Sequence, residues 1–239
     1  MNKFPYPPST ILSFLVLLVL FASVIIGLES ETNSSRATQA EQTAPTSASQ
    51  QQPQSRTVGF LRPTAPLSQE EIRDLRFMRE EEKLARDVYS VLFQKWQLPI
   101  FQNIAQAEHK HTSAVLNVIN RYGISDPAAG KPAGVYADAH LTKMYKDLIA
   151  KGQRSVEDAL WVGGIIEEVD IDDLDKAISR TQRGDIIRVY RNIQLGSRNH
   201  LRGFAKSLAG LGRDYKPQHL PLESVTQILA GPMENNRPF

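Results

Sequence analysis

A glutamate and a histidine interrupt the apolar face of a helix that the sequence predicts over residues 101–122. The apolar side chains of this segment recur at helical spacing and should face a core: Ile104, Val115, Val118, Ile119 and Tyr122. Glu108 and His111, three positions apart, fall on the same stripe. Because an unpaired buried carboxylate is very costly, a metal ion bound by both side chains would explain their inward position. The alternative is an internal hydrogen-bonded pair that ties two helices together.

Three other long segments with helical periodicity also carry metal-competent side chains on their inward faces. Residues 68–96 supply one, residues 156–179 supply two and residues 185–209 supply one: Glu81, Glu167, Asp170 and His200. With Glu108, the carboxylates carry four negative charges, which two divalent cations would cancel. The sequence therefore predicts a dinuclear metal centre held by Glu81, Glu108, His111, Glu167, Asp170 and His200.

The same periodicity places other charged side chains at the solvent side or at its margin. In residues 68–96 these are Arg79, Glu80, Glu82 and Lys83, with Glu80 exposed and Glu82 at the margin. Glu168 falls on the solvent side of residues 156–179 and would compete with Glu167 only if that helix were rotated. Without a metal, Glu81 would pair with an arginine, His200 would be a hydrogen-bonded core histidine and Asp170 would orient a histidine.

Local signals define the elements that must position these residues. Ser68 and Glu71 form a capping-box pattern at the start of the first helix, and Ser155 caps another. The expected helices are 68–96, 101–122, 138–151, 156–179 and 185–209, followed by a short one in LESVTQILA. Because no segment shows strand alternation, the fold class is all-α. We expect a four-helix bundle over residues 67–215, with an extra short helix before its third helix and a C-terminal tail over 216–239.

Composition limits the chemistry of any site. The chain of 239 residues contains no cysteine, which excludes disulfides, thiolate metal sites and a cysteine nucleophile. A metal site must therefore use histidine and carboxylates, which suit iron, manganese or zinc. The formal net charge of +2, without a dense basic patch, gives no reason to expect a nucleic-acid partner.

The N-terminal third has a different character. An apolar run from Ile11 to Leu28 indicates an export signal or a membrane anchor over residues 1–29. Residues 30–66 are rich in Ser, Thr, Gln, Ala and Pro, which predicts a disordered linker. We expect a domain held outside the cytoplasm by the membrane anchor, or a secreted or periplasmic one if the segment is cleaved.

The inward-facing residues resemble those of the ferritin-like di-iron carboxylate superfamily, whose pattern is one Glu from each of two helices and a Glu-x-x-His from each of two others. More narrowly, four blocks are similar to the DUF2202 domain family: MREEEKLARDVY, NIAQAEHKH, IIEEVDIDDL and GSRNHLRGF. The pattern maps onto Glu81, Glu108, His111, Glu167 and His200. The sequence departs at Ser197, where the second motif would have Glu, and Asp170 is our candidate for the missing carboxylate.

The resemblance implies a ferritin-like bundle that binds two iron ions, with one ion or manganese as alternatives. It also implies ferroxidase-like or peroxide-consuming chemistry, with Fe(II) and O₂ or peroxide as small substrates. The alternative function is a non-catalytic metal- or partner-binding helical module, which the Ser197 departure favours.

Overall fold

The computed structural model describes residues 66–235, which form six helices and no strand. The helices are α1 (Gln69–Trp96), α2 (Pro99–Arg121), α3 (Ala139–Gly152), α4 (Val156–Ser179), α5 (Gly184–Ala209) and α6 (Leu222–Ala230). The all-α prediction is confirmed for this range, and each expected helix begins and ends within about two residues of its predicted position. The predicted export signal or anchor lies outside the described residues, as does the predicted linker up to residue 65.

Local sequence explains the helix ends. The Glu71 amide donates to the Ser68 hydroxyl at 3.1 Å, and the Glu71 carboxylate accepts from the Ser68 amide at 2.8 Å. The capping box therefore starts α1 as predicted. Gly123 follows α2 with φ +69°, a backbone conformation that favours glycine.

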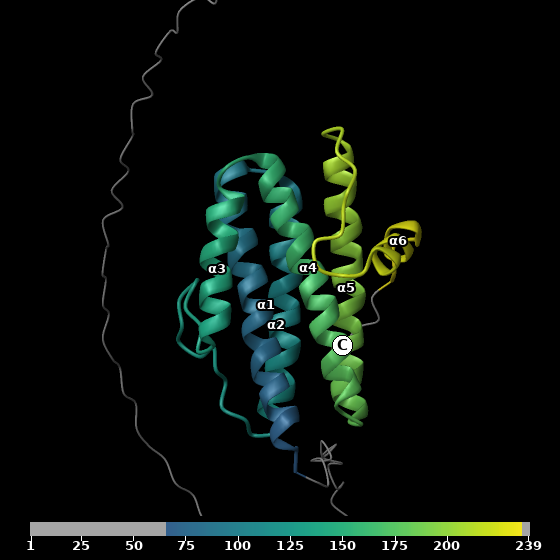
Figure 1. The fold of residues 1–239 in the computed structure, drawn as a ribbon. Helices are drawn as coiled ribbons and strands as arrows, with labels where there is room; N and C mark the ends of the chain where they lie inside the picture. Colours follow the sequence, from purple (N-terminus) through teal and green to yellow (C-terminus); the bar gives the residue numbers. More distant parts are fainter. Residues whose placement is uncertain (1–65, 236–239) are drawn as a thin grey trace, which may run out of the picture. The chain divides into compact units, whose positions relative to one another are not determined.

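The four long helices lie side by side as two closely packed pairs, α1 with α2 and α4 with α5 (Figure 1). Short connections make each pair antiparallel, whereas residues 122–138 form a long link between α2 and α3. The extra helix α3 packs against α1 and α4. Within residues 66–235, no helix has both the length and the apolarity that crossing a bilayer requires.

The buried apolar residues of the bundle form two separate clusters. One contains Tyr89, Phe101, Ile166 and Phe204. The other contains Leu75, Val115, Leu174 and Ile193. On every long helix, the predicted inward-facing polar residues fall between the segments that supply the two clusters. The bundle therefore has a polar layer between two apolar ones.

The link at residues 122–138 corrects the predicted solvent side of α1. Arg79, Glu80 and Lys83 are all buried. Arg79 pairs with Asp126 at 3.1 Å, and Lys83 donates to the backbone carbonyls of Pro132 and Val135. The Glu80 carboxylate accepts from the amides of residues 137 and 138. Glu82 is likewise buried rather than marginal, because it faces α2. Periodicity within α1 could not reveal that distant residues cover its outer side.

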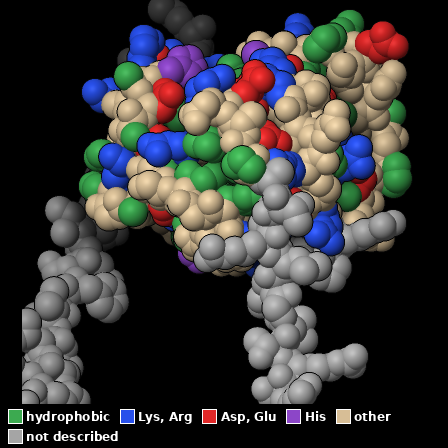
Figure 2. Space-filling model, turned by 90° about the horizontal axis from the view of Figure 1, so that it is seen from below, with side chains coloured by type: hydrophobic (Ala, Val, Ile, Leu, Met, Phe, Trp, Pro, Cys, Tyr) green, Lys and Arg blue, Asp and Glu red, His purple; other side chains and the backbone are tan. Residues whose placement is uncertain are grey.

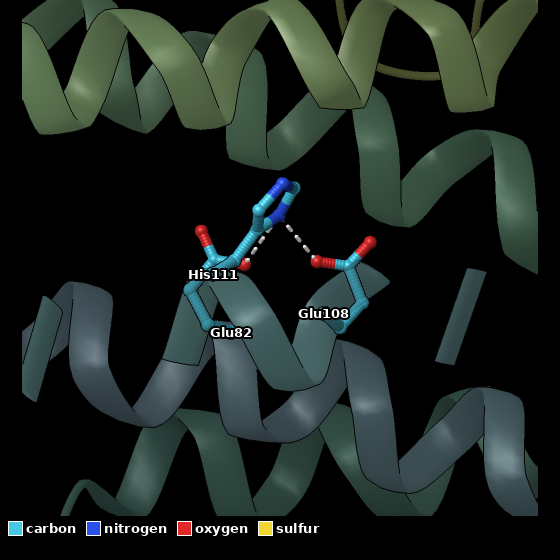
Figure 3. A group of neighbouring side chains, drawn as sticks. All are labelled: Glu82, Glu108 and His111. Carbon is cyan, nitrogen blue, oxygen red and sulfur yellow. Dashed lines mark hydrogen bonds and ion pairs between the residues drawn. The ribbon is translucent and has the colours of Figure 1, made fainter. Parts of the chain in front are cut away.

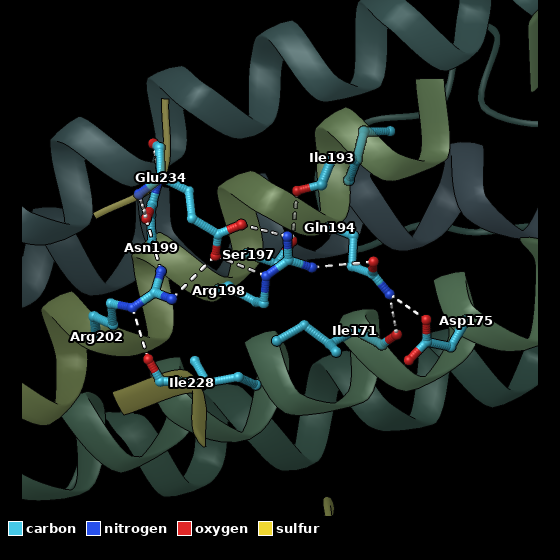
Figure 4. A network of polar contacts seen from close by, with 10 residues as sticks. All are labelled: Ile171, Asp175, Ile193, Gln194, Ser197, Arg198, Asn199, Arg202, Ile228 and Glu234. Carbon is cyan, nitrogen blue, oxygen red and sulfur yellow. Dashed lines mark hydrogen bonds and ion pairs between the residues drawn. The ribbon is translucent and has the colours of Figure 1, made fainter. Parts of the chain in front are cut away.

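Glu168 is also buried rather than exposed, because the C-terminal residues fold back onto α4. Its carboxylate accepts from the Tyr215 hydroxyl and from the backbone amides of residues 218–220. Farther along, Glu234 pairs with Arg198 and Arg202 of α5 (Figure 4). The described part of the predicted tail is therefore fastened to α4 and α5.

The end of the bundle in Figure 2 mixes acidic and basic side chains rather than concentrating one sign. This distribution agrees with the small net charge of +2. It gives this face no concentration of basic side chains.

Close packing of α4 on α5 yields a test of the fold. A Cβ at Gly163 would lie 2.3 Å from Cε1 of the buried Phe204 ring. Overpacking of this kind costs about 1–3 kcal/mol, which outweighs the gain of up to about 1 kcal/mol in helix propensity from glycine to alanine. Gly163→Ala should therefore lower the free energy of unfolding in urea titrations. Gly184→Ala, where a Cβ would meet nothing within 4 Å, is the control. Equal stability of the Gly163 variant and the wild type would contradict the packing.

Candidate metal centre

The polar layer brings five side chains together in two overlapping groups. One consists of Glu82, Glu108 and His111, and the other of Glu108, Glu167 and His200. Within each group, one potential ligand atom from each residue lies within 4.8 Å of the others. Four of the five residues are buried, and the His200 side chain is 13% exposed. These groups could hold a metal ion.

Glu108 is the residue that the two groups share. Its Oε2 lies 2.8 Å from His111 Nδ1, and its Oε1 lies 2.9 Å from His200 Nδ1. Glu82 Oε2 lies 3.4 Å from His111 Nδ1 (Figure 3), and Glu167 Oε2 lies 3.3 Å from His200 Nδ1. One carboxylate therefore stands between two imidazoles, each of which has a second carboxylate beside it.

Four helices and their packing position this set. Glu82 comes from α1, Glu108 and His111 from consecutive turns of α2, Glu167 from α4 and His200 from α5. The Tyr89 hydroxyl donates to Glu167 and fixes its orientation. Gly196 makes room for His111, because a Cβ there would lie 2.7 Å from the imidazole Cε1.

Four of the six predicted site residues lie together in the structure, and two do not. The structure brings Glu108, His111, Glu167 and His200 together, and it places Glu82, which the sequence prediction omitted, beside them. Glu81 and Asp170 belong to neither group. Asp170 Oδ2 accepts from the Ser197 hydroxyl at 2.5 Å, whereas its Oδ1 and both Glu81 oxygens are buried and accept no hydrogen bond. The signal for Glu82 was its place in the run Glu80-Glu81-Glu82, which periodicity alone could not resolve.

Burial and mutual charge perturb the ionisation of these groups. Burial raises the pKa of Glu82 to about 8. Burial alone would also raise the pKa of Glu108, but His111 and His200 hold it well below its usual range. Burial disfavours a charged His200, yet the Glu167 and Glu108 carboxylates outweigh this and raise its pKa to about 9. Protons and imidazolium groups thus balance the charge when no metal is bound.

The donor set fits a divalent transition metal. Three carboxylates and two imidazoles offer the oxygen and nitrogen ligands that iron, manganese and zinc accept. The buried Glu82 Oε1 has no hydrogen-bond partner, which is costly in a dry interior unless a ligand or proton satisfies it. Metal binding would displace the protons that the free groups hold, so affinity should rise with pH.

These pKa shifts make the stability of the metal-free protein depend on pH. The folded pKa values of Glu82, about 8, and His200, about 9, exceed their ordinary values of 4.5 and 6.5. Between pH 6.5 and 8 the native state therefore holds more protons than the unfolded chain, so the free energy of unfolding should fall as pH rises. Urea titrations of chelator-treated protein measure this slope, and Glu82→Gln should make it shallower. A flat or rising profile would contradict the assigned ionisation.

Comparison with known proteins gives the site its family context. Residues 71–232 match the family described as "Uncharacterized protein domain (DUF2202)". The chain is 45% identical over 172 residues to uncharacterized protein MJ0754 of Methanocaldococcus jannaschii, covering 72% of this chain and 93% of that protein. The crystal structure of hypothetical protein MJ0754 superposes with a TM-score of 0.70, covering 72% of this chain and 98% of that one. The chain therefore belongs to the DUF2202 family.

Proposed function

We propose that this protein binds a dinuclear metal centre of the ferritin-like type, with iron as the metal. The observation that carries the proposal is the position of Glu108, whose two oxygens face two different histidines in a buried layer. A carboxylate in this position would be the ligand that both groups of the centre share. Glu82 and His111 would complete the ligands on one side, and Glu167 and His200 those on the other.

The order of the ligands along the chain supports this reading. Di-iron carboxylate bundles use one Glu from each of two helices and a Glu-x-x-His from each of the other two. Here Glu82 and Glu167 come from α1 and α4, and Glu108 with His111 forms the motif of α2. The antiparallel pairs α1–α2 and α4–α5, joined by one long connection, also support the proposal, because a ferritin-like fold would require such a connection.

The motif of α5 is incomplete, since Ser197 stands where a second Glu would be. Its hydroxyl donates to Asp170, so the Asp170 carboxylate lies close to the position from which that Glu would reach the centre. Asp170 Oδ1 accepts no hydrogen bond and is available to a ligand. We assign Asp170 as the replacement carboxylate, held by Ser197.

Iron in such a carboxylate-rich site would supply electrons to O₂ or peroxide through its Fe(II) and Fe(III) states. The protein's own contribution is to position the ligands and exclude bulk water. Tyr89 orients Glu167, and the two apolar clusters close the layer from both ends. We further propose that residues 1–29 direct this domain out of the cytoplasm, as an anchor or as a cleaved signal.

Metal content tests the ligand assignment. The wild type should bind two metal ions per chain, and Glu108→Ala should lose most of both because it removes the shared ligand. His200→Ala should retain about one metal ion per chain, since the group of Glu82, Glu108 and His111 remains. His109→Ala, which changes the exposed neighbouring histidine of α2, is the matched control. Elemental analysis and circular dichroism measure metal and helicity; wild-type metal content in Glu108→Ala would refute the assignment.

The reaction with oxygen distinguishes a redox enzyme from a non-catalytic metal-binding module. After Fe(II) and air are added, a reactive di-iron centre should develop the absorption band of oxo-bridged Fe(III), and Glu108→Ala should not. A protein that binds two ions without forming this band would instead be a non-catalytic metal-binding module. A stable helical domain that binds no metal would contradict the metal centre itself.

A further inference from the structure

A second set of buried carboxylates lies beside the proposed centre, on the side where α1 meets α4. In the described part of the chain, the buried side-chain atoms without a hydrogen-bond partner include four carboxylate oxygens. These are both oxygens of Glu81, Oε1 of Glu82 and Oδ1 of Asp170. Glu81 is only 4% exposed, so its oxygens are shielded from bulk water. Buried carboxylate oxygens without hydrogen-bond donors indicate that these side chains share a ligand.

The carboxylates follow one another from the surface to the centre. Asp173 lines a pocket of about 510 Å³ between α1, α4 and the long link. Asp173 and Asp170 lie one turn apart on α4, with the Asp173 side chain 24% exposed and Asp170 buried. Burial, together with the charges of these two carboxylates, raises the pKa of Glu81. Asp170 accepts from the hydroxyl of Ser197 on α5 at 2.5 Å. Asp173 therefore lies at the pocket, and Glu81 and Asp170 are the buried carboxylates next to it.

We propose that Asp173 and Glu81 form the route by which a divalent cation passes from the pocket to Asp170, the carboxylate assigned to the dinuclear centre. This inference rests on the proposed function, because the route has a purpose only if the centre binds metal. Its ligands are oxygen atoms alone, and no histidine takes part. Imidazole ligands suit iron, nickel, copper and zinc better than oxygen ligands alone do. A cation should therefore bind weakly along the route and more tightly at the centre.

The spacing of the route agrees with transit rather than storage. Glu81 does not join any group of three metal-competent atoms within 4.8 Å, whereas Glu82, Glu108, His111, Glu167 and His200 do. A cation at Glu81 would have fewer protein ligands at a time and would be released more easily. The oxygens without hydrogen-bond partners can therefore transfer a cation towards the dinuclear centre.

Lys176 controls the outer end of this route. Its Nζ lies 2.9 Å from Asp173 Oδ1 and 2.8 Å from Asp172 Oδ2, and the side chain is half exposed. An incoming cation can displace the ammonium from Asp173 while Asp172 retains it. The pocket as a whole does not select cations, because Arg73, Arg76 and Arg180 line it with the acidic residues Asp74, Glu80, Asp138 and Asp173. Selection therefore begins at Asp173.

The rate of metal uptake tests the route separately from the centre. Chelator-treated full-length protein is mixed with Co²⁺ in a stopped-flow instrument, and the visible absorption of bound cobalt is followed. Asp173→Asn should load at least about tenfold more slowly, the lower end of what focused charge contributes to association rates. Its final cobalt content should equal that of the wild type. Lys176→Gln should load faster than the wild type, because it removes the competing cation.

Two further variants complete the experiment. Glu81→Gln preserves the shape of the side chain and should also load slowly, with helicity checked by circular dichroism. Asp175→Asn is the matched control, since it removes the same charge from α4 at a residue that bonds to Gln194 on α5 (Figure 4). Wild-type loading rates in Asp173→Asn and Glu81→Gln would overturn the route while leaving the centre in place. A wild-type protein that takes up no cobalt would overturn the centre and the route together.

Discussion

The main constraint on this structure is the free-energy cost of burying ionisable side chains in a layer without bulk water. Glu108 stands between two histidines, and each histidine has a second carboxylate beside it. Desolvation penalises every charge in this layer, so each group must find a partner of opposite charge, a proton or a metal. The arrangement of the four long helices is the means by which those partners meet.

The two apolar clusters show how the chain can fold around such a layer. They lie on either side of it and contain the largest fully buried side chains, among them Tyr89, Tyr190, Phe101 and Phe204. Burial of this apolar surface drives folding, while protons on the carboxyls and imidazoles keep the layer close to neutral without metal. A cation bound by these groups would replace those protons. The fold therefore does not need a metal ion for its stability, in contrast to small domains whose metal site supplies most of their stability.

The charged run of α1 shows how closely packing distinguishes neighbouring residues. Arg79 pairs with Asp126, Glu80 binds backbone amides of the long link, and Lys83 binds its carbonyls. Glu82 faces the centre, and Glu81 faces α4. Successive residues of a helix point about 100° apart, so this run of five charged side chains meets three surroundings: the long link, α2 and α4. All five are buried because α2, α4 and the long link surround this part of the helix.

The sequence by itself determined the helices and much of the polar layer. Caps such as Ser68 and the apolar periodicity act within a few residues, so the helix bounds could be predicted closely. The same periodicity placed Glu108, His111, Glu167 and His200 on inward faces, where the structure brings them together. Only the tertiary structure decided that Glu82 rather than Glu81 lies beside His111. Only it could show that the long link covers Arg79 and Lys83, and that the C-terminal segment covers Glu168. The reason is physical: periodicity fixes a direction around one helix axis, whereas burial and partnership depend on what distant segments place in that direction.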